Sequence, residues 1–343
     1  MKILIVGPSW VGDMVMAQTL FKALKAKEPE LVIDVLAPQW SRPILERMPE
    51  VNAALEMPVG HGSLQLGMRR KLGKLLAREN YDRAMVLPNS LKSALVPFFA
   101  GIPLRTGWRG EMRYGLLNDI RLLDKRRYPL MIERFIALAY ETGEKLPEKL
   151  PRPELVVDCS NVKACLERYQ LDLSRPVLAL CPGAEFGEAK RWPANHYATV
   201  AQEKINDGWQ VWLFGSQKDH AVADHIRSQI TEVAQGRCVN LAGETSLADA
   251  VDLMSVADAV VSNDSGLMHI AAALGRTLVV LYGSSSPDFT PPLNDHVRVL
   301  RTGIECSPCF KRECPLGHMK CLNDLEAEQV LDALKDLLPE SVH

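Results

Sequence analysis

The feature that most constrains the fold is the polar segment SNDSGLMH at residues 262–269. The apolar run before it, residues 257–261, predicts a buried strand, and residues 270–274 after it predict a helix that ends at Gly275. This succession places a helix N-terminus at the carboxyl end of a parallel strand. Free backbone N–H groups and the positive end of the helix dipole favour an anion there, commonly a phosphate. The alternative is an ordinary helix cap by Asp264 or Ser265.

The same alternation of strands and helices runs along both halves of the chain. In the first half we expect strands at residues 2–6, 32–36, 84–87 and within 101–107, and helices at 14–27, 40–48, 67–79, 92–100 and 131–142. In the second half we expect strands at 177–181, 211–214, 257–262 and 277–282, and helices at 161–169, 195–207, 219–230, 247–254, 265–274 and 324–338. This alternation predicts parallel sheets with right-handed crossovers.

The two halves meet at a proline-rich segment. Pro147, Pro151 and Pro153 lie among charged residues, which is typical of an interdomain linker. We therefore predict an α/β protein with two Rossmann-like domains, residues 1–155 and 156–343, whose parallel sheets face a cleft. Ligands bind outside the carboxyl ends of the strands in sheets of this kind.

Composition narrows the class of function. The chain has 343 residues and a formal net charge of −2, which gives no support for binding to nucleic acid. No run approaches the roughly 20 apolar residues that a membrane span requires, so we expect a cytoplasmic protein. Helix 67–79 carries five cations, and such a run is either a solvated face or a surface that meets anions. They are Arg69, Arg70, Lys71, Lys74 and Arg78.

Four of the eight cysteines cluster near the C-terminus, as Cys306-x2-Cys309-x4-Cys314-x6-Cys321 with His318 among them. A structural metal site, reduced thiols and disulfides are the three interpretations. The expected cytoplasmic location favours the first two over disulfides. The spacing differs from that of the usual paired CxxC zinc ribbon.

The first strand leads into the loop GPSWVGD at residues 7–13, which matches neither familiar nucleotide fingerprint. Asp13 stands where a P-loop would have its lysine. A carboxylate there would repel a phosphate, so the loop is expected to face a neutral hydroxyl. A helix N-terminus keeps a carboxylate ionised, and an ionised, positioned carboxylate can act as a general base. The alternative is that Asp13 only caps the helix.

Three loops follow strands of the second half and should project to one side of its sheet: residues 182–193, residues 215–219 and the opening segment. Together they supply glycines, a lysine, carboxylates and a helix N-terminus. This set suits a nucleotide diphosphate, with backbone amides for the phosphate oxygens, Lys190 for charge and a carboxylate for ribose hydroxyls. Alternatively, Lys190, Arg191 and Glu185 are surface charges and His269 only packs or caps.

These segments, in this order, resemble the bacterial ADP-heptose–lipopolysaccharide heptosyltransferases of glycosyltransferase family 9. The resemblance covers nearly the whole chain and rests on GPSWVGD at 7–13, LPNS at 87–90, FFAGIP at 98–103, RTGWRGEMRYGLLN at 105–118, PGAEFG at 182–187, KRWP at 190–193, NDSGLMH at 263–269 and SSPDFTPP at 285–292. It implies a GT-B fold, with the acceptor mainly on the first domain and ADP-heptose mainly on the second. It also implies an inverting transfer of L-glycero-D-manno-heptose that releases ADP.

The resemblance assigns roles to individual residues. Asp13 matches the proposed base, and Lys190 matches a lysine that contacts the donor phosphates or heptose. The expected donor-binding residues are Gly183, Glu185, Lys190, Gly215, Ser216, Asp264, Ser265, Gly266 and His269. Three positions differ from the family members that add the first heptose. Those members have paired threonines where this chain has Glu185 and Phe186, and a ribose-binding glutamate where it has Gln217.

The basic residues of the first half suit a phosphorylated lipid acceptor. We expect the acceptor to be heptosyl-Kdo2-lipid A, so that its first inner-core heptose receives the sugar, and we expect peripheral contact with the cytoplasmic face of the inner membrane. No cofactor is expected to be required, and a role for Mg²⁺ is left open. The expected acceptor-binding residues are Asn89, Ser90, Lys92, Arg105, Arg109 and Arg113.

Two other classes of protein share this architecture. A nucleotide-sugar 2-epimerase would need no lipid acceptor, and the Asp13 loop argues against it. A non-catalytic binding protein would have no use for a base, so the presence of Asp13 together with Lys190 disfavours it.

Overall fold

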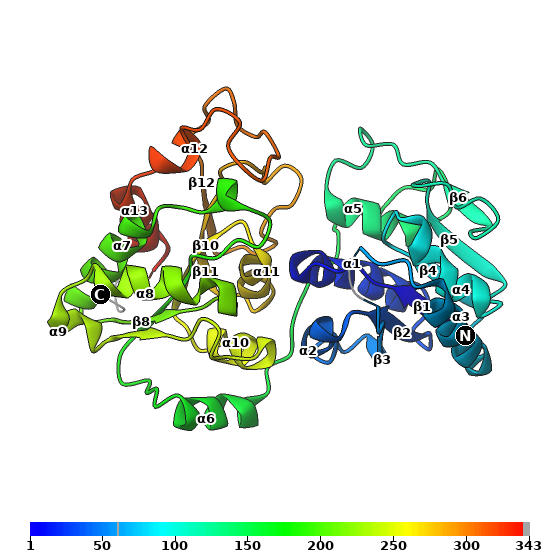
Figure 1. Ribbon diagram of the computed structural model, residues 1–343, viewed down its shortest axis with the longest axis horizontal. Helices are drawn as coiled ribbons and strands as arrows, with labels where there is room; N and C mark the ends of the chain where they lie inside the picture. Colours follow the sequence, from blue (N-terminus) through cyan, green and yellow to red (C-terminus); the bar gives the residue numbers. More distant parts are fainter. Residues whose placement is uncertain (60–61, 339–343) are drawn as a thin grey trace. The chain divides into compact units, whose positions relative to one another are not determined.

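The computed structural model describes residues 1–59 and 62–338 and divides into two compact units, Met1–Val156 and Val157–His343 (Figure 1). The division falls one residue after the predicted boundary and follows the proline-rich segment. Each unit is a parallel sheet with helices on both faces.

Six parallel strands form the sheet of the first unit, in the order β3-β2-β1-β4-β5-β6. They are β1 (Lys2–Val6), β2 (Val32–Ala37), β3 (Val51–Glu56), β4 (Arg83–Val86), β5 (Leu104–Trp108) and β6 (Asp119–Arg121). The helices are α1 (Val11–Lys27), α2 (Arg42–Leu45), α3 (Leu66–Leu76), α4 (Leu95–Phe99) and α5 (Met131–Ile136).

Alternation along the strands divides the apolar side chains of the first unit between two layers. Leu4 and Val6 of β1 and Val86 of β4 pack in a core with Leu76 of α3 and Val96 of α4. The opposite face of the sheet is covered by α1, which packs against α5. Because α1 lies in this second layer, nearly all its residues from Met14 to Leu24 are buried.

The sheet of the second unit also has six parallel strands, in the order β12-β11-β10-β7-β8-β9. They are β7 (Val177–Cys181), β8 (Gln210–Leu213), β9 (Cys238–Asn240), β10 (Ala259–Asn263), β11 (Thr277–Leu281) and β12 (Val297–Leu300). The helices are α6 (Cys159–Arg168), α7 (Ala194–Asn206), α8 (His220–Ser228), α9 (Glu232–Gln235), α10 (Leu247–Met254), α11 (Gly266–Ala273), α12 (Lys320–Asn323) and α13 (Ala327–Leu337).

The two sheets have one topology. Counted from the first strand of each unit, both follow the order 3-2-1-4-5-6 that is typical of the Rossmann fold. The order reverses between β1 and β4 in the first unit and between β7 and β10 in the second. Ligands bind at the carboxyl ends of strands beside such a reversal. The loops after β1, β4, β7 and β10 are therefore the places to look for a site.

The sequence-based assignment of elements needs several corrections. Strands β3, β6, β9 and β12 were not predicted; they lie toward the sheet edges and are short or only partly buried, so they carry a weak hydrophobic pattern. The helix expected at 131–142 ends at Ile136 and continues as one 3-10 turn. The helix expected at 324–338 is α13, which starts three residues later, at Ala327, and the short helix α12 before it was not predicted.

The longest helix, α1, has 17 residues. Over residues 1–59 and 62–338, every helix is too short or too polar to cross a membrane. Helix α1 also starts at Val11, three residues earlier than predicted. Asp13 therefore lies inside its first turn.

Two glycines of α3 provide a matched test of the packing in the first unit. A Cβ added at Gly73 would lie 2.5 Å from Phe99 Cβ and 2.8 Å from the Val96 carbonyl oxygen, whereas one added at Gly67 would meet nothing within 4 Å. We expect Gly73→Ala to lower the free energy of unfolding by about 1–3 kcal/mol, because α3 and α4 must separate. We expect Gly67→Ala to raise it by up to about 1 kcal/mol through helix propensity. Urea unfolding measures both, and equal effects would contradict this packing.

Candidate active site

The segment after β10 and the loop after β7 are joined by an ion pair. Lys190 Nζ lies 2.5 Å from Asp264 Oδ2, and the side chains of Lys190 and Asp264 are 17% and 4% exposed. Ser285, which follows β11, donates its hydroxyl to the same carboxylate oxygen. Lys190 Nζ also lies 5.0 Å from the centre of the Phe186 ring. The structure thus brings the predicted residues Lys190 and Asp264 together and adds Ser285, which was not among the predicted donor-binding residues.

Asn263, the last residue of β10, holds both ends of the loop after β7. Its Nδ2 donates to the carbonyl of Pro182 at 2.7 Å, and its Oδ1 accepts the backbone N–H of Trp192 at 3.1 Å. The Trp192 indole donates to the carbonyl of Leu325 at 2.7 Å. Asn263 is fully buried, so these bonds are shielded from water. They fix the loop that carries Lys190.

The position of Asp219 explains why glycine is needed at two of the predicted donor-binding positions. Its buried carboxylate accepts the backbone N–H and the hydroxyl of Ser216, at 2.9 and 2.7 Å. A Cβ added at Gly183 would lie 2.5 Å from the Asp219 carboxylate, and one added at Gly215 would lie 2.7 Å from Asp219 Cβ. These glycines therefore allow two loops to close on Asp219. Asp219 was seen at the start of a helix, but its position between the loops had no signal in the sequence.

The N-terminus of α11 does not match the interpretation in which Ser265 or Asp264 is an ordinary helix cap. Ser265 is the N-cap residue with φ −144° and ψ 176°, but its side chain makes no capping hydrogen bond, and its Oγ lies 3.3 Å from Ser262 Oγ. The carboxylate of Asp264 is occupied by Lys190 and Ser285. The first turn, which begins at Gly266, thus receives no side-chain cap from Ser265. Its N–H groups and the helix dipole suit an anionic ligand.

His269 lies on α11 and is buried. Burial lowers the pKa of the imidazole to about 4; the nearby Asp264 opposes this shift and Lys190 adds to it. His269 is therefore neutral at pH 7 and can offer a hydrogen bond but no charge.

Glu185 and Ser216 are exposed, unlike the other predicted donor residues. Glu185 lies on the surface, where its carboxylate is 2.5 Å from Lys218 Nζ. An exposed pair of this kind is held weakly and is free to exchange partners. A donor contact by Glu185 stays a prediction.

Asp13 occupies the first turn of α1, directly after the loop that follows β1. It is half-buried, and the N-cap position belongs to Trp10, which makes no side-chain cap. Asp13 is therefore not the N-cap residue of α1. A carboxylate in the first turn interacts favourably with the helix dipole. It stands at the carboxyl end of β1, beside the topological reversal of the first sheet.

The predicted acceptor residues differ in their place and exposure. Asn89, Ser90 and Lys92 follow β4 at the reversal, and Asn89 is exposed. Arg109 is also exposed. Arg105 is partly buried and donates to the carbonyls of Ile102 and Leu116 within its own unit.

The prediction that Arg113 contacts the acceptor needs a correction. Arg113 is 2% exposed, and its guanidinium donates to the carbonyls of Pro88 and Trp108, both at 2.6 Å, and to the hydroxyl of Ser93 at 3.1 Å. Burial lowers its pKa. Arg113 therefore shapes the loop after β4 from inside and does not project toward a ligand. The sequence shows its charge but not the carbonyls that surround it.

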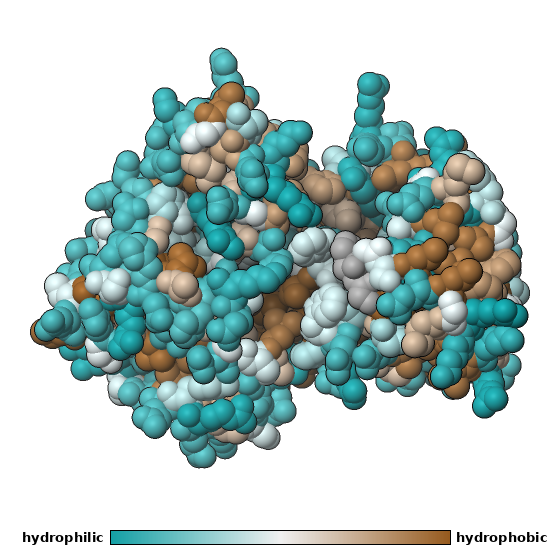
Figure 2. Space-filling model, viewed as in Figure 1, coloured by the Kyte–Doolittle hydropathy of each residue, from teal (hydrophilic) through white to brown (hydrophobic). Residues whose placement is uncertain are grey.

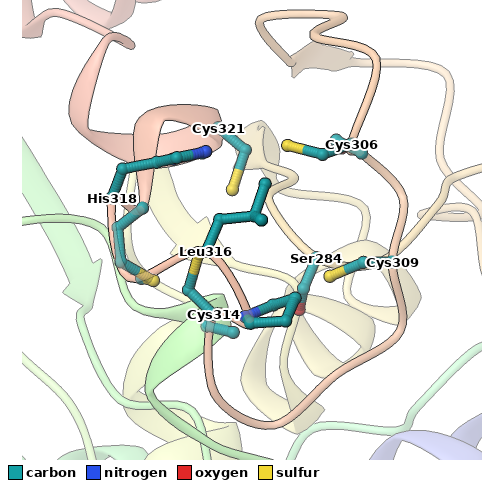
Figure 3. A pocket seen from close by; sticks show the side chains of 11 residues that line it. Ser284, Cys306, Cys309, Cys314, Leu316, His318 and Cys321 are labelled. Carbon is teal, nitrogen blue, oxygen red and sulfur yellow. The ribbon is translucent and has the colours of Figure 1, made fainter.

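The four clustered cysteines line one pocket together with His318 and Ser284 (Figure 3). All eight cysteines are free thiols, so the disulfide interpretation is wrong. Within the part of the chain that the structure describes, no three His, Cys, Asp or Glu side chains are placed to hold a metal ion. Hydrogen bonds from backbone N–H groups, chiefly the N–H of Met319, lower the pKa of the Cys314 thiol. Burial and the other three thiols raise the pKa of Cys321.

The buried imidazole of His269 predicts how stability depends on pH. The unfolded chain takes up a proton at this ring below its ordinary pKa of 6.5, but the folded protein does so only near pH 4. Stability is therefore lost as the pH falls through this window, by about 2 kcal/mol at pH 5. We expect His269→Gln to remove this part of the loss, measured by urea unfolding at about pH 7.5 and pH 5. His296→Gln, at an exposed histidine, is the control and should behave as wild type. The same pH dependence in all three proteins would contradict the assignment.

Comparison with known proteins places the chain in a family. The family model for glycosyltransferase family 9 (heptosyltransferase) matches residues 69–320. Lipopolysaccharide heptosyltransferase 2 of Escherichia coli (strain K12) is 54% identical, covering 98% of this chain and 99% of that protein. Lipooligosaccharide heptosyltransferase 2 of Haemophilus influenzae is 49% identical, covering 98% and 99%. The solved structure of E. coli ADP-heptose lps heptosyltransferase II superposes with a TM-score of 0.90 at 53% identity, covering 98% of each chain. The chain therefore belongs to glycosyltransferase family 9, the heptosyltransferases, and has their GT-B fold.

Proposed function

We propose that the protein transfers L-glycero-D-manno-heptose from ADP-heptose to the first heptose of the lipopolysaccharide inner core, heptosyl-Kdo2-lipid A, and releases ADP. The observation that carries this proposal is the near full-length similarity, at 54% identity, to a lipopolysaccharide heptosyltransferase 2. The solved relative at 53% identity is named for ADP-heptose, which supports the choice of donor.

In this proposal the second unit binds the donor. The N-terminus of α11 and the amides near Gly183 and Gly215 receive the diphosphate, and Lys190 supplies positive charge. Negative charge grows on the diphosphate as the sugar leaves. Donors already fixed in place stabilise that charge without reorganising, and Lys190 is held in place by Asp264. This scheme uses no cofactor, and the helix terminus and Lys190 supply the positive charge that meets the leaving group.

Asp13 acts as the general base on the first unit. The acceptor hydroxyl gives its proton to the Asp13 carboxylate as its oxygen bonds to the anomeric carbon of heptose. The bond from that carbon to the ADP oxygen breaks, and ADP leaves with the electron pair. A single displacement from the opposite face inverts the anomeric configuration. Asn89, Ser90, Lys92, Arg105 and Arg109 are the proposed acceptor contacts.

The acceptor is linked to a lipid, so the protein must meet a membrane surface to reach it. We place it at the cytoplasmic face of the inner membrane as a peripheral protein. The helices that the structure describes offer no membrane span.

Release of ADP from ADP-heptose tests the reaction and the acceptor together. We expect release with lipid A core that carries one heptose and little release with the heptose-free core, because the proposed acceptor hydroxyl belongs to the first heptose. Release with the heptose-free core would instead make the protein the first-step enzyme. Binding of the donor without release on either acceptor would contradict the transferase proposal.

Replacing Asp13 separates the base from donor binding. We expect Asp13→Asn and Asp13→Ala to lower kcat by about 10²–10⁴-fold, the range for loss of a general base, with the Kd for ADP-heptose unchanged. Initial rates of ADP release and calorimetric titration of the donor provide the two readouts. Asp82→Asn, an exposed carboxylate on the same unit, is the control and should leave both values unchanged. A parallel loss of donor affinity in the Asp13 variants would argue against the role as base.

A further inference from the structure

The outer face of α3 carries a row of cations. Arg70, Lys74 and Arg78 are spaced by four residues, so they lie along one side of the helix and the turn that follows it, and Lys71 lies beside them. All four are exposed. Among the residues that the structure describes, no ion pair joins a carboxylate to any of these four cations, and the nearby Glu79 pairs with Lys2 at 2.8 Å. Like charges at this spacing destabilise an isolated helix. The row is therefore suited to an anionic partner.

Large apolar side chains flank this cationic row instead of being hidden beneath it. Leu66 is 50% exposed, Met68 42% and Leu75 58%, and Leu64 in the preceding segment is 51% exposed. At 100° per residue, Leu66 lies on one side of the cations, and Met68 and Leu75 lie on the other. The opposite side of the helix already packs inward through Gly73 and Leu76. These exposed side chains are thus additional to the packing of α3 on its own unit.

The apolar surface continues onto the neighbouring elements. Phe98 on α4 is 41% exposed and Leu104 on β5 is 43% exposed. Helix α4 packs directly against α3, where Gly73 meets Phe99. Figure 2 shows hydrophobic residues gathered over α4 and β5, next to the hydrophilic residues of α3.

The surface is held rigidly. Arg69, on the inner side of α3, is 4% exposed and donates to the carbonyls of Leu64 at 2.7 Å, Ser63 at 3.2 Å and Lys92 at 3.3 Å. These bonds fix the segment before α3 and tie the helix to the turn after β4. The exposed residues are therefore arranged before any partner binds.

We infer that this face, named here the α3 face and defined by Leu64, Leu66, Met68, Arg70, Lys71, Lys74, Leu75, Arg78, Phe98 and Leu104, docks the first unit onto an anionic lipid bilayer. The cations meet lipid phosphates and are attracted by the negative surface potential of such a bilayer. The flanking leucines enter the boundary between headgroups and acyl chains, as in helices that lie in the plane of a membrane. The inference rests on the proposed function in that a lipid-linked acceptor gives the enzyme a reason to lie there. Because Lys92 belongs to the same turn as the proposed acceptor contacts, docking would bring that turn close to the membrane.

Flotation with vesicles tests the inference on the full-length protein. We expect the protein to float with vesicles of phosphatidylcholine and phosphatidylglycerol, to bind vesicles of phosphatidylcholine alone much more weakly, and to be released partly by high salt. The triple variant Lys71→Gln/Lys74→Gln/Arg78→Gln should bind the anionic vesicles about a hundredfold less tightly. The matched control Lys163→Gln/Arg227→Gln/Lys335→Gln removes three exposed charges from the second unit and should bind as wild type. Leu66→Ser/Leu75→Ser keeps the cations and should also weaken binding.

Three outcomes would overturn the inference: equal binding to both kinds of vesicle, equal loss in the α3 variant and its control, or a wild-type dimer in solution that the α3 variant converts to monomer. Release of ADP with a delipidated, one-heptose core acceptor is measured alongside. If the α3 variant keeps that activity and wild type does not bind vesicles, the docking inference fails and the proposed function stands. If vesicles bind but no protein releases ADP, the proposed function fails instead.

Discussion

The ion pair between Lys190 and Asp264 is the interaction on which the candidate site depends. It joins the loop after β7 to the turn after β10, the two strands beside the topological reversal of the second sheet. A largely buried pair gains little net stability, because both charges lose water, but it fixes positions strongly when other bonds complete it. Ser285 completes the carboxylate and Asn263 holds both ends of the loop. Lys190 is therefore in place before a ligand arrives.

The main architecture could be predicted from the sequence because each central strand is a short apolar run, and the segment after it has apolar residues at helical spacing. Strands β1, β4, β7, β10 and β11 are buried on both faces and give this pattern. Strands such as β3 and β12 have exposed or half-buried positions, so their pattern is weak and they were missed. The family resemblance carried the remaining step, from α/β architecture to the GT-B fold.

The positions of candidate residues were predictable where they follow a strand, as with Asp13, Lys190 and Asp264, and their roles stay predictions. The site was not predictable where a residue's role depends on partners distant in the sequence. Asn263 acts through Pro182 and Trp192, and Asp219 through two glycines that close on it. Arg113 shows the converse error, since its charge suggested a ligand but its bonds are to backbone carbonyls inside the protein. A charged side chain on the surface is available to a ligand, whereas a buried one bonds to groups inside the protein. The sequence alone does not show which residues are buried.

Titration of ADP into a double-mutant cycle tests most directly whether Lys190 and Asp264 act as one unit in donor binding. The four proteins are wild type, Lys190→Ala, Asp264→Asn and the double variant. If Asp264 positions Lys190 for the diphosphate, each single change weakens ADP binding, and the double change costs clearly less than the sum, with a coupling of about 0.5–3 kcal/mol. Additive effects, or ADP affinity unchanged in Lys190→Ala, would contradict the account.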